Sequence, residues 1–246
     1  MPIDQRTDNR SFPADPPADP DDPAAILDND WAAFTTLQQM TDHWHRPGWP
    51  PGHRTYYWML LPHSAQLTAL TRHCQHHLAP FGLDLVPDDG LHITMAKAGD
   101  RAGTSRQQLE ALMHTVSSDP PSAFDLSAHP LTGSRGAVRY SLTPWSPLLR
   151  LHAALNGAAR QHALPERRPT TGFRPHLGIG YHNRRRSAQP LIDAVSELRA
   201  LPSVPLRADR VELVELRREG PGYRWNVLHT VSLTPPRSAP ATGRAT

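Results

Sequence analysis

Two short apolar stretches, far apart in the chain, each hold a histidine between aliphatic residues. In a β-strand, side chains two positions apart point to the same face, so His92 and Thr94 would lie together while the residues between them face a core. In the second stretch His176 takes the place of His92, and Gly178 stands where the first has a hydroxyl. The stretches are LHITMAK at residues 91–97 and PHLGIGY at residues 175–181.

Segments with the apolar spacing of a helix flank both histidine stretches, so the order helix, histidine strand, helix occurs twice. The predicted helices are residues 67–78, 109–116, 148–162 and 191–198, and the other predicted strands are residues 56–61, 123–128, 137–142, 211–216 and 225–233. We therefore expect an α+β fold of two related lobes. Mainly antiparallel sheets would face a central cleft that both histidines share, with helices on the outside.

The first thirty residues differ from the rest in charge. They carry eight aspartates and two arginines, a net charge of −6, which leaves 24 basic and 15 acidic residues in the remainder, a net charge of +9. A basic body suits a phosphate-bearing ligand, although an ordinary arginine-rich surface is the alternative. We expect a disordered acidic tail at 1–29, a bilobal domain at 30–234 and a disordered tail at 235–246.

The start of the body is predicted to be a helix. Trp31, Phe34 and Leu37 recur at helical spacing as far as Trp44, after an Asp-Asn-Asp sequence at 28–30 that is typical of a helix N-cap.

A single cysteine, Cys74, cannot form an intramolecular disulfide, and its helical spacing with leucines indicates a buried thiol in a reducing compartment. The acidic first thirty residues lack the apolar core of a signal peptide, and no apolar run is long enough to span a bilayer. We expect a cytoplasmic monomer.

The two histidine stretches, LHITM at 91–95 and FRPHLGI at 173–179, resemble the paired His-x-Thr/Ser motifs of the two-histidine (2H) phosphoesterases, in the 2'-5' RNA ligase-like or RNA cyclic phosphodiesterase branch. The resemblance extends from about Trp44 to Leu233. It implies cleavage of a 2',3'-cyclic phosphate or a related nucleotide or RNA end, with no metal or other cofactor. A single His-x-Thr is a weak signal, whereas two in a duplicated pattern are moderately specific.

The implied chemistry needs a base that deprotonates water and an acid that protonates the leaving sugar oxygen. Histidine, with a pKa near ~6.5, serves either role at neutral pH, so His92 and His176 are the candidate pair, without an assignment of base and acid. Thr94 would donate its hydroxyl to a phosphate oxygen, and Gly178 holds the matching phosphate-binding position of the second motif. Lys97, Arg174 and Tyr181 are further candidate substrate contacts. In an ideal strand Lys97 faces away from Thr94.

Gly178 departs from the family pattern because it removes a hydroxyl donor. The enzyme would then be slower, use a backbone amide or a water instead, or bind a ligand that needs the space. A catalytically weakened nucleotide-binding or RNA-binding protein with the same cleft is therefore the alternative function, and a histidine-rich structural or metal-buffering domain is a third.

Several other residues have a plainer interpretation beside a functional one. His73 and His77 have the i, i+4 spacing of metal ligands, and His43 and His45 lie two apart, but solvated surfaces explain both pairs. We expect His229 in the core. Arg184, Arg185 and Arg186 are expected in a solvated loop rather than on nucleic acid. Core positions are expected for the aromatic residues that could stack on a base, Trp145, Tyr56 and Tyr57.

Overall fold

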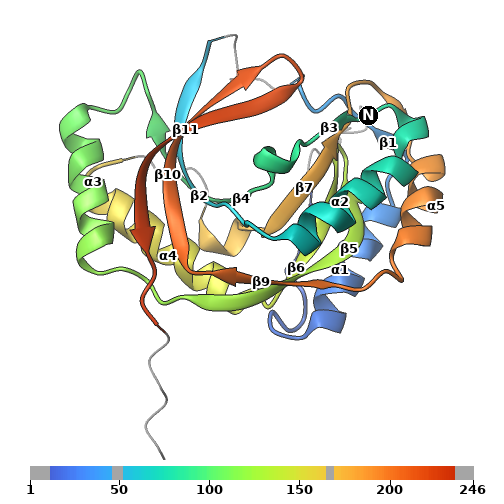
Figure 1. The fold of residues 1–246 in the computed structure, drawn as a ribbon, viewed down its shortest axis with the longest axis horizontal. Coiled ribbons are helices and arrows are strands. Elements are labelled where there is room, and N and C mark those ends of the chain that lie inside the picture. Colours follow the sequence, from blue (N-terminus) through green and yellow to red (C-terminus); the bar gives the residue numbers. More distant parts are fainter. Residues whose placement is uncertain (1–11, 46–51, 165–168, 236–246) are drawn as a thin grey trace, which may run out of the picture.

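Two antiparallel sheets form the centre of the molecule in a computed structural model that describes residues 12–45, 52–164 and 169–235 (Figure 1). The four-stranded sheet has the order β11-β10-β2-β4, formed by β2 (Arg54–Leu60), β4 (Ile93–Asp100), β10 (Arg210–Glu219) and β11 (Gly222–Ser232). The five-stranded sheet has the order β3-β7-β6-β5-β9, formed by β3 (Asp84–Leu85), β5 (Phe124–Ser134), β6 (Ala137–Thr143), β7 (His176–Tyr181) and β9 (Val204–Ala208). The predicted α+β class with antiparallel sheets is confirmed.

Helices connect the two sheets across the molecule. The helices are α1 (Pro23–Thr35), α2 (Ala65–His77), α3 (Arg106–Ser118), α4 (Ser146–Gln161) and α5 (Gln189–Leu198). The helix α2 precedes β4 in the chain but packs on β7, whereas α4 precedes β7 but packs on β4 (Figure 1). Each lobe therefore supplies a helix to the other, and β4 and β7 are brought into contact.

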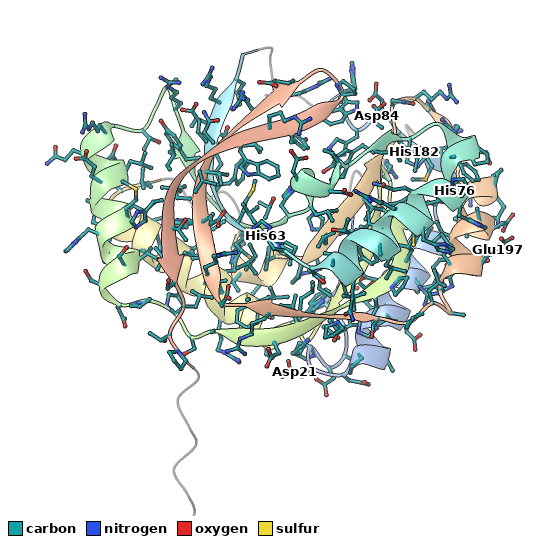
Figure 2. The ribbon with its side chains drawn as sticks, in the orientation of Figure 1. Asp21, His63, His76, Asp84, His182 and Glu197 are labelled. Atoms are coloured by element: carbon teal, nitrogen blue, oxygen red, sulfur yellow. The ribbon has the colours of Figure 1, made fainter. Side chains whose placement is uncertain are left out.

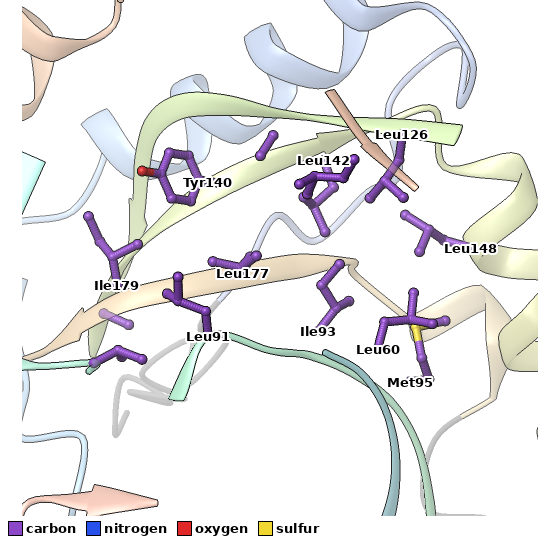
Figure 3. Close-up of a cluster of buried hydrophobic side chains, with 14 of the residues drawn as sticks. Leu60, Leu91, Ile93, Met95, Leu126, Tyr140, Leu142, Leu148, Leu177 and Ile179 are labelled. Atoms are coloured by element: carbon purple, nitrogen blue, oxygen red, sulfur yellow. The ribbon is translucent and has the colours of Figure 1, made fainter. Parts of the chain in front are cut away.

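The apolar residues of both histidine stretches belong to one core. Leu91 and Ile93 lie beside Leu177 and Ile179 in a buried cluster that also contains Tyr140 (Figure 3). Each of these side chains is at most 4% exposed. Because side chains alternate along a strand, the polar positions between them are left on the opposite faces of β4 and β7.

The first helix is where the sequence prediction is wrong. The predicted disordered tail at 1–29 overlaps α1, which begins at Pro23 after Asp22, whose carboxylate accepts hydrogen bonds from the Ala24 and Ala25 amides. Ile26 is fully buried, so the helix is held by tertiary packing that the acidic composition does not reveal.

The same helix also ends earlier than predicted. It stops at Thr35, and β1 (Gln39–Met40) pairs with β8 (Arg186–Ser187) instead of continuing the helix to Trp44. Asp30, predicted to lie at the N-cap, is a buried residue inside the helix. Of the predicted tails, residues 1–11 and 236–246 lie outside the described ranges.

Other predicted elements agree with the structure. The helix α3 begins after Ser105, which forms a capping box with Gln108. Cys74 is fully buried in α2, as expected. The strand β9 and the two-residue strands were not predicted. Among the described helices, no segment has both the length and the apolar character needed to cross a bilayer.

Candidate active site

The first histidine is held by the turn that precedes it. Its Nδ1 atom donates a hydrogen bond to the carbonyl oxygen of Gly90 at 2.8 Å, at the end of the 3-10 turn Asp88–Gly90. A carbonyl only accepts, so Nδ1 carries the proton, and in the neutral ring Nε2 keeps its lone pair. The imidazole of His92 packs edge-on against Trp225, with ring centres 5.2 Å apart, and burial lowers the pKa of His92.

The second histidine repeats this arrangement. The Nδ1 atom of His176 donates to the carbonyl oxygen of Arg174 at 2.9 Å, again two residues earlier in the chain. Burial lowers the pKa of His176 to about 3, and the positive charge of Arg139 contributes in the same direction. Each imidazole is therefore anchored through Nδ1, with Nε2 left for other chemistry.

The two histidines are electrostatically coupled. After burial and the charge of Arg139, the charge of His92 is a further cause that lowers the pKa of His176. This coupling agrees with the contact between β4 and β7 and with the core that the two histidine stretches share. The structure therefore places the two predicted catalytic histidines at the starts of two contacting strands of different sheets, with His92 directly before β4 and His176 as the first residue of β7.

A β-bulge changes which residues accompany His92. Met59 of β2 is opposite Thr94, Tyr57 is opposite Lys97, and Met95 is the extra residue between the paired positions. Because opposite residues share a face, Lys97 and Thr94 lie on the same face, and the prediction that they point apart is wrong. The Lys97 ammonium donates to both carboxylate oxygens of Asp100 at 2.6 Å, so an ion pair holds it.

The strand of His176 has a bulge at the matching place. Arg139 of β6 is opposite Gly178 and Ala137 is opposite Tyr181, with Ile179 in the bulge. Tyr181 therefore lies on the face of Gly178. It also lines, together with His92, a small open groove. The other lining residues are Leu85, Val86, Pro87, Gly90, Gly222 and Tyr223.

Arg174 has a different surrounding from the one predicted. Its guanidinium donates to the carbonyl oxygens of Pro13 and Ala14, at 3.3 and 2.9 Å, and also to those of Thr171 and Phe173. These contacts attach the segment before α1 to the second lobe, and they give no support to a substrate contact. The same segment places the Phe12 ring 4.7 Å from the ring of His176.

A buried polar group beside His176 was missed at the sequence level. The Arg139 guanidinium, 1% exposed, pairs with Asp30 of α1, and Ser141 donates to the same carboxylate at 2.6 Å. Ser141 is directly opposite His176, so this group lies on the histidine face of the sheet. The sequence contains a pattern that could have revealed this group, because Arg139 and Ser141 alternate with the apolar Val138, Tyr140 and Leu142. This alternation places both polar side chains on one face of the strand.

The other aromatic residues, histidines and arginines named from the sequence differ in how deeply they are buried. Trp145 and Tyr56 are core residues, as expected, whereas Tyr57 is half-buried beside a small apolar cluster around Met59. His73, His77 and His45 are exposed, whereas His43 is buried, with its Nε2 atom 3.0 Å from the Tyr223 hydroxyl. Arg184 and Arg185 are exposed and Arg186 is half-buried.

His229 is half-buried and bonded to Ser117 at 2.8 Å, so its predicted core position is wrong. No group of three or more His, Cys, Asp or Glu side chains suited to holding a metal ion occurs among the described residues.

Comparison with known proteins gives one family. The sequence profile of the 2'-5' RNA ligase superfamily matches residues 61–220, more than half of the chain. The chain matches no curated protein in sequence.

Solved structures share the fold. A protein described as a phosphoesterase has a TM-score of 0.56 and 18% identity, covering 74% of this chain and 99% of that chain. LigT of E. coli in complex with ATP has a TM-score of 0.54 and 18% identity, and the match covers 74% of this chain and 99% of LigT. TT0787 of Thermus thermophilus has a TM-score of 0.54 and 17% identity, covering 75% and 99%. With its two histidine strands inside the matched region, this protein belongs to the 2'-5' RNA ligase superfamily of two-histidine phosphoesterases.

Proposed function

We propose that this protein is a phosphodiesterase that hydrolyses a 2',3'-cyclic phosphate, or a related nucleotide or RNA end, with His92 and His176 as its acid and base. The observation that carries the proposal is the matching pair of imidazoles, each anchored through Nδ1 to a backbone carbonyl on one of two contacting strands. Because Nδ1 of each ring is bonded to a carbonyl oxygen, Nε2 is the nitrogen that can give or take a proton, as a general acid and a general base require.

The charges around the histidines favour one assignment of roles. Burial first and the charge of Arg139 second oppose a positive charge on His176, while the charge of Asp30 acts more weakly in the other direction. His176 is therefore the neutral ring and the base. Its Nε2 atom takes a proton from water while the water oxygen bonds to phosphorus. The bond from phosphorus to the 2' or 3' oxygen breaks, and protonated His92 gives its Nε2 proton to that oxygen. Proton exchange with solvent then restores both rings.

Thr94 supplies a hydroxyl on the face of His92, where it would donate to a non-bridging phosphate oxygen as negative charge develops. The net positive body attracts a phosphate-bearing substrate. LigT of E. coli, which shares the fold, has been solved with ATP, with 3'-AMP and with phosphate, and this supports a nucleotide as the ligand class.

The second candidate function is a nucleotide-binding or RNA-binding protein that has lost turnover. Gly178 is the observation that favours it, since the second motif has no hydroxyl at this position. A protein of this kind would bind cyclic nucleotides without converting them.

One assay separates the two functions. Purified protein is incubated with the four nucleoside 2',3'-cyclic phosphates and a short RNA with a cyclic phosphate end, in EDTA, and products are followed by chromatography. We expect monoester product that is lost in His92→Ala and in His176→Ala. It should be retained in His73→Ala, whose side chain is exposed on α2. Saturable binding without product in the unmodified chain would instead support the binding protein.

A further inference from the structure

The two histidine strands are matched beyond the motif itself. Each has a bulge after the second motif position, at Met95 in β4 and at Ile179 in β7. A bulge shifts the alternation of side chains by one residue, so the fifth residue after each histidine returns to the histidine face. That residue is Lys97 in the first strand and Tyr181 in the second. The bulge therefore adds a polar side chain to each motif.

Tyr181 lies close to the place of the missing hydroxyl. A Cβ atom built on Gly178 would be 3.6 Å from the Tyr181 hydroxyl oxygen, which is ordinary contact distance. The hydroxyl of a serine or threonine at residue 178 would extend one bond further from that Cβ atom. The phenol oxygen of Tyr181 is therefore near the position from which the hydroxyl of the family motif would extend.

The ring of Tyr181 is fixed by other aromatic rings. Its centre is 4.0 Å from that of His43, 5.1 Å from Trp44 and 5.7 Å from Tyr223. The side chain is 8% exposed and lines the groove that His92 also lines. A donor held this firmly loses little conformational entropy when it binds a ligand, and such preorganisation makes a donor effective at a transition state.

We infer that Tyr181 is a catalytic residue whose hydroxyl donates to a non-bridging phosphate oxygen, in place of the serine or threonine that the motif lacks at Gly178. The inference rests on the proposed function and deepens it. The phenol oxygen lies within contact distance of a Cβ atom at residue 178, so it is near the place where the motif hydroxyl would be attached. Lys97, the counterpart of Tyr181, is held in an ion pair with Asp100, and the first motif keeps its own hydroxyl at Thr94.

The test is a set of four variants assayed for turnover of a 2',3'-cyclic nucleotide. Tyr181→Phe keeps the ring and removes the donor, and we expect kcat to fall by about 10²–10³, the loss seen when one oxyanion donor is removed from other enzymes. Gly178→Ser alone should not raise turnover. In Gly178→Ser combined with Tyr181→Phe, the serine should restore at least part of the lost rate. Tyr56→Phe, on the core face of β2, is the control that should keep the rate of the original chain.

Two outcomes overturn the inference while leaving the proposed function intact. One is full turnover in Tyr181→Phe when His92→Ala is inactive, and the other is an inactive Tyr181→Phe that the added serine does not restore. If the original chain shows no turnover, calorimetry with adenosine 2',3'-cyclic phosphate decides, and unchanged affinity in Tyr181→Phe overturns the inference. If the original chain neither binds nor cleaves this nucleotide, the inference about Tyr181 and the proposed function are both overturned.

Discussion

Arg139 and Asp30 form an ion pair that joins the first helix to the strand beside His176. The guanidinium donates to the two carboxylate oxygens at 3.1 and 2.8 Å, and both residues are 1% exposed. The pair has opposite effects on the imidazole: the positive charge of Arg139 lowers the pKa of His176 and the negative charge of Asp30 raises it. The helix α1, which precedes the region matched by the family profile, thus takes part in the electrostatics of the candidate site.

Replacing Asp30 by alanine is expected to destabilise the fold. Loss of one partner leaves a buried guanidinium without its counter-ion, which costs about 3–5 kcal/mol in other proteins. Urea denaturation should therefore show a large decrease in the free energy of unfolding for Asp30→Ala. Asp28→Ala, an exposed position of the same helix, should stay within about 0.5 kcal/mol of the original chain. Equal stability of the two variants would mean that the pair is energetically unimportant.

The proposed roles predict an acid-shifted pH profile. The base His176 is neutral above a pKa of about 3, and the acid His92 is protonated only below its pKa, which burial holds under 6.5. For the free enzyme, kcat/KM should therefore be highest on the acid side of 6.5 and fall as the pH rises through the pKa of His92. The measurement is kcat/KM for a cyclic nucleotide between pH 4 and 8. A rise in kcat/KM from pH 6 to 8 would contradict this assignment.

Phe12 is expected to hold the pKa of His176 down. Its ring lies 4.7 Å from the imidazole and 4.9 Å from the guanidinium carbon of Arg139. Because burial is the largest cause of the lowered pKa, Phe12→Ala should admit water and raise the pKa of His176. Titration followed by NMR of the histidine rings measures this directly. Phe124→Ala, at the far end of β5, is the control, and an equal pKa in both variants would show that the Phe12 ring does not cover the imidazole.

The sequence predicted the fold class and the two histidine strands because their signals are local. Apolar residues at period two or 3.6, a capping box at Ser105 and the repeated order of elements report directly on local structure. Bulges have no such signal. Lys97 was assigned from an unbroken period of two, and the assignment was wrong because an extra residue interrupts the pairing of β4. His229 does lie opposite the core residue Leu213, but β11 is the edge strand of its sheet and the ring is only half-buried.

The partners of the candidate site depend on contacts between distant parts of the chain. Asp30 is separated from Arg139 by more than a hundred residues, and its place in an acidic segment suggested a solvated cap instead. Arg174 adjoins a motif histidine in sequence, yet its hydrogen bonds go to backbone carbonyls. Composition and spacing predict which strands hold the candidate catalytic histidines. Tertiary packing decides which side chains lie beside these histidines and shift their pKa values.

A buried histidine next to Tyr181 predicts how stability depends on pH. His182 is fully buried, and neither ring nitrogen has a hydrogen-bond partner in the described part of the chain. Burial, with a smaller contribution from the charge of Arg186, lowers the pKa of His182 to about 4. Figure 2 labels it on the same side of the molecule as Asp84, whose strand β3 pairs with β7.

The sign of the effect follows from proton uptake. As the pH falls below about 6.5, the unfolded chain protonates this histidine while the folded chain does not, so stability decreases until the folded pKa near 4 is reached. The difference between the two pKa values corresponds to roughly 3 kcal/mol. Thermal or urea unfolding of His182→Leu should therefore show a smaller loss of stability between pH 7 and pH 4 than the original chain. His176 keeps its own contribution in both proteins, and His76→Gln, exposed on α2, should retain the original slope. An unchanged slope in His182→Leu would mean that His182 takes up its proton at the same pH in the folded and the unfolded chain.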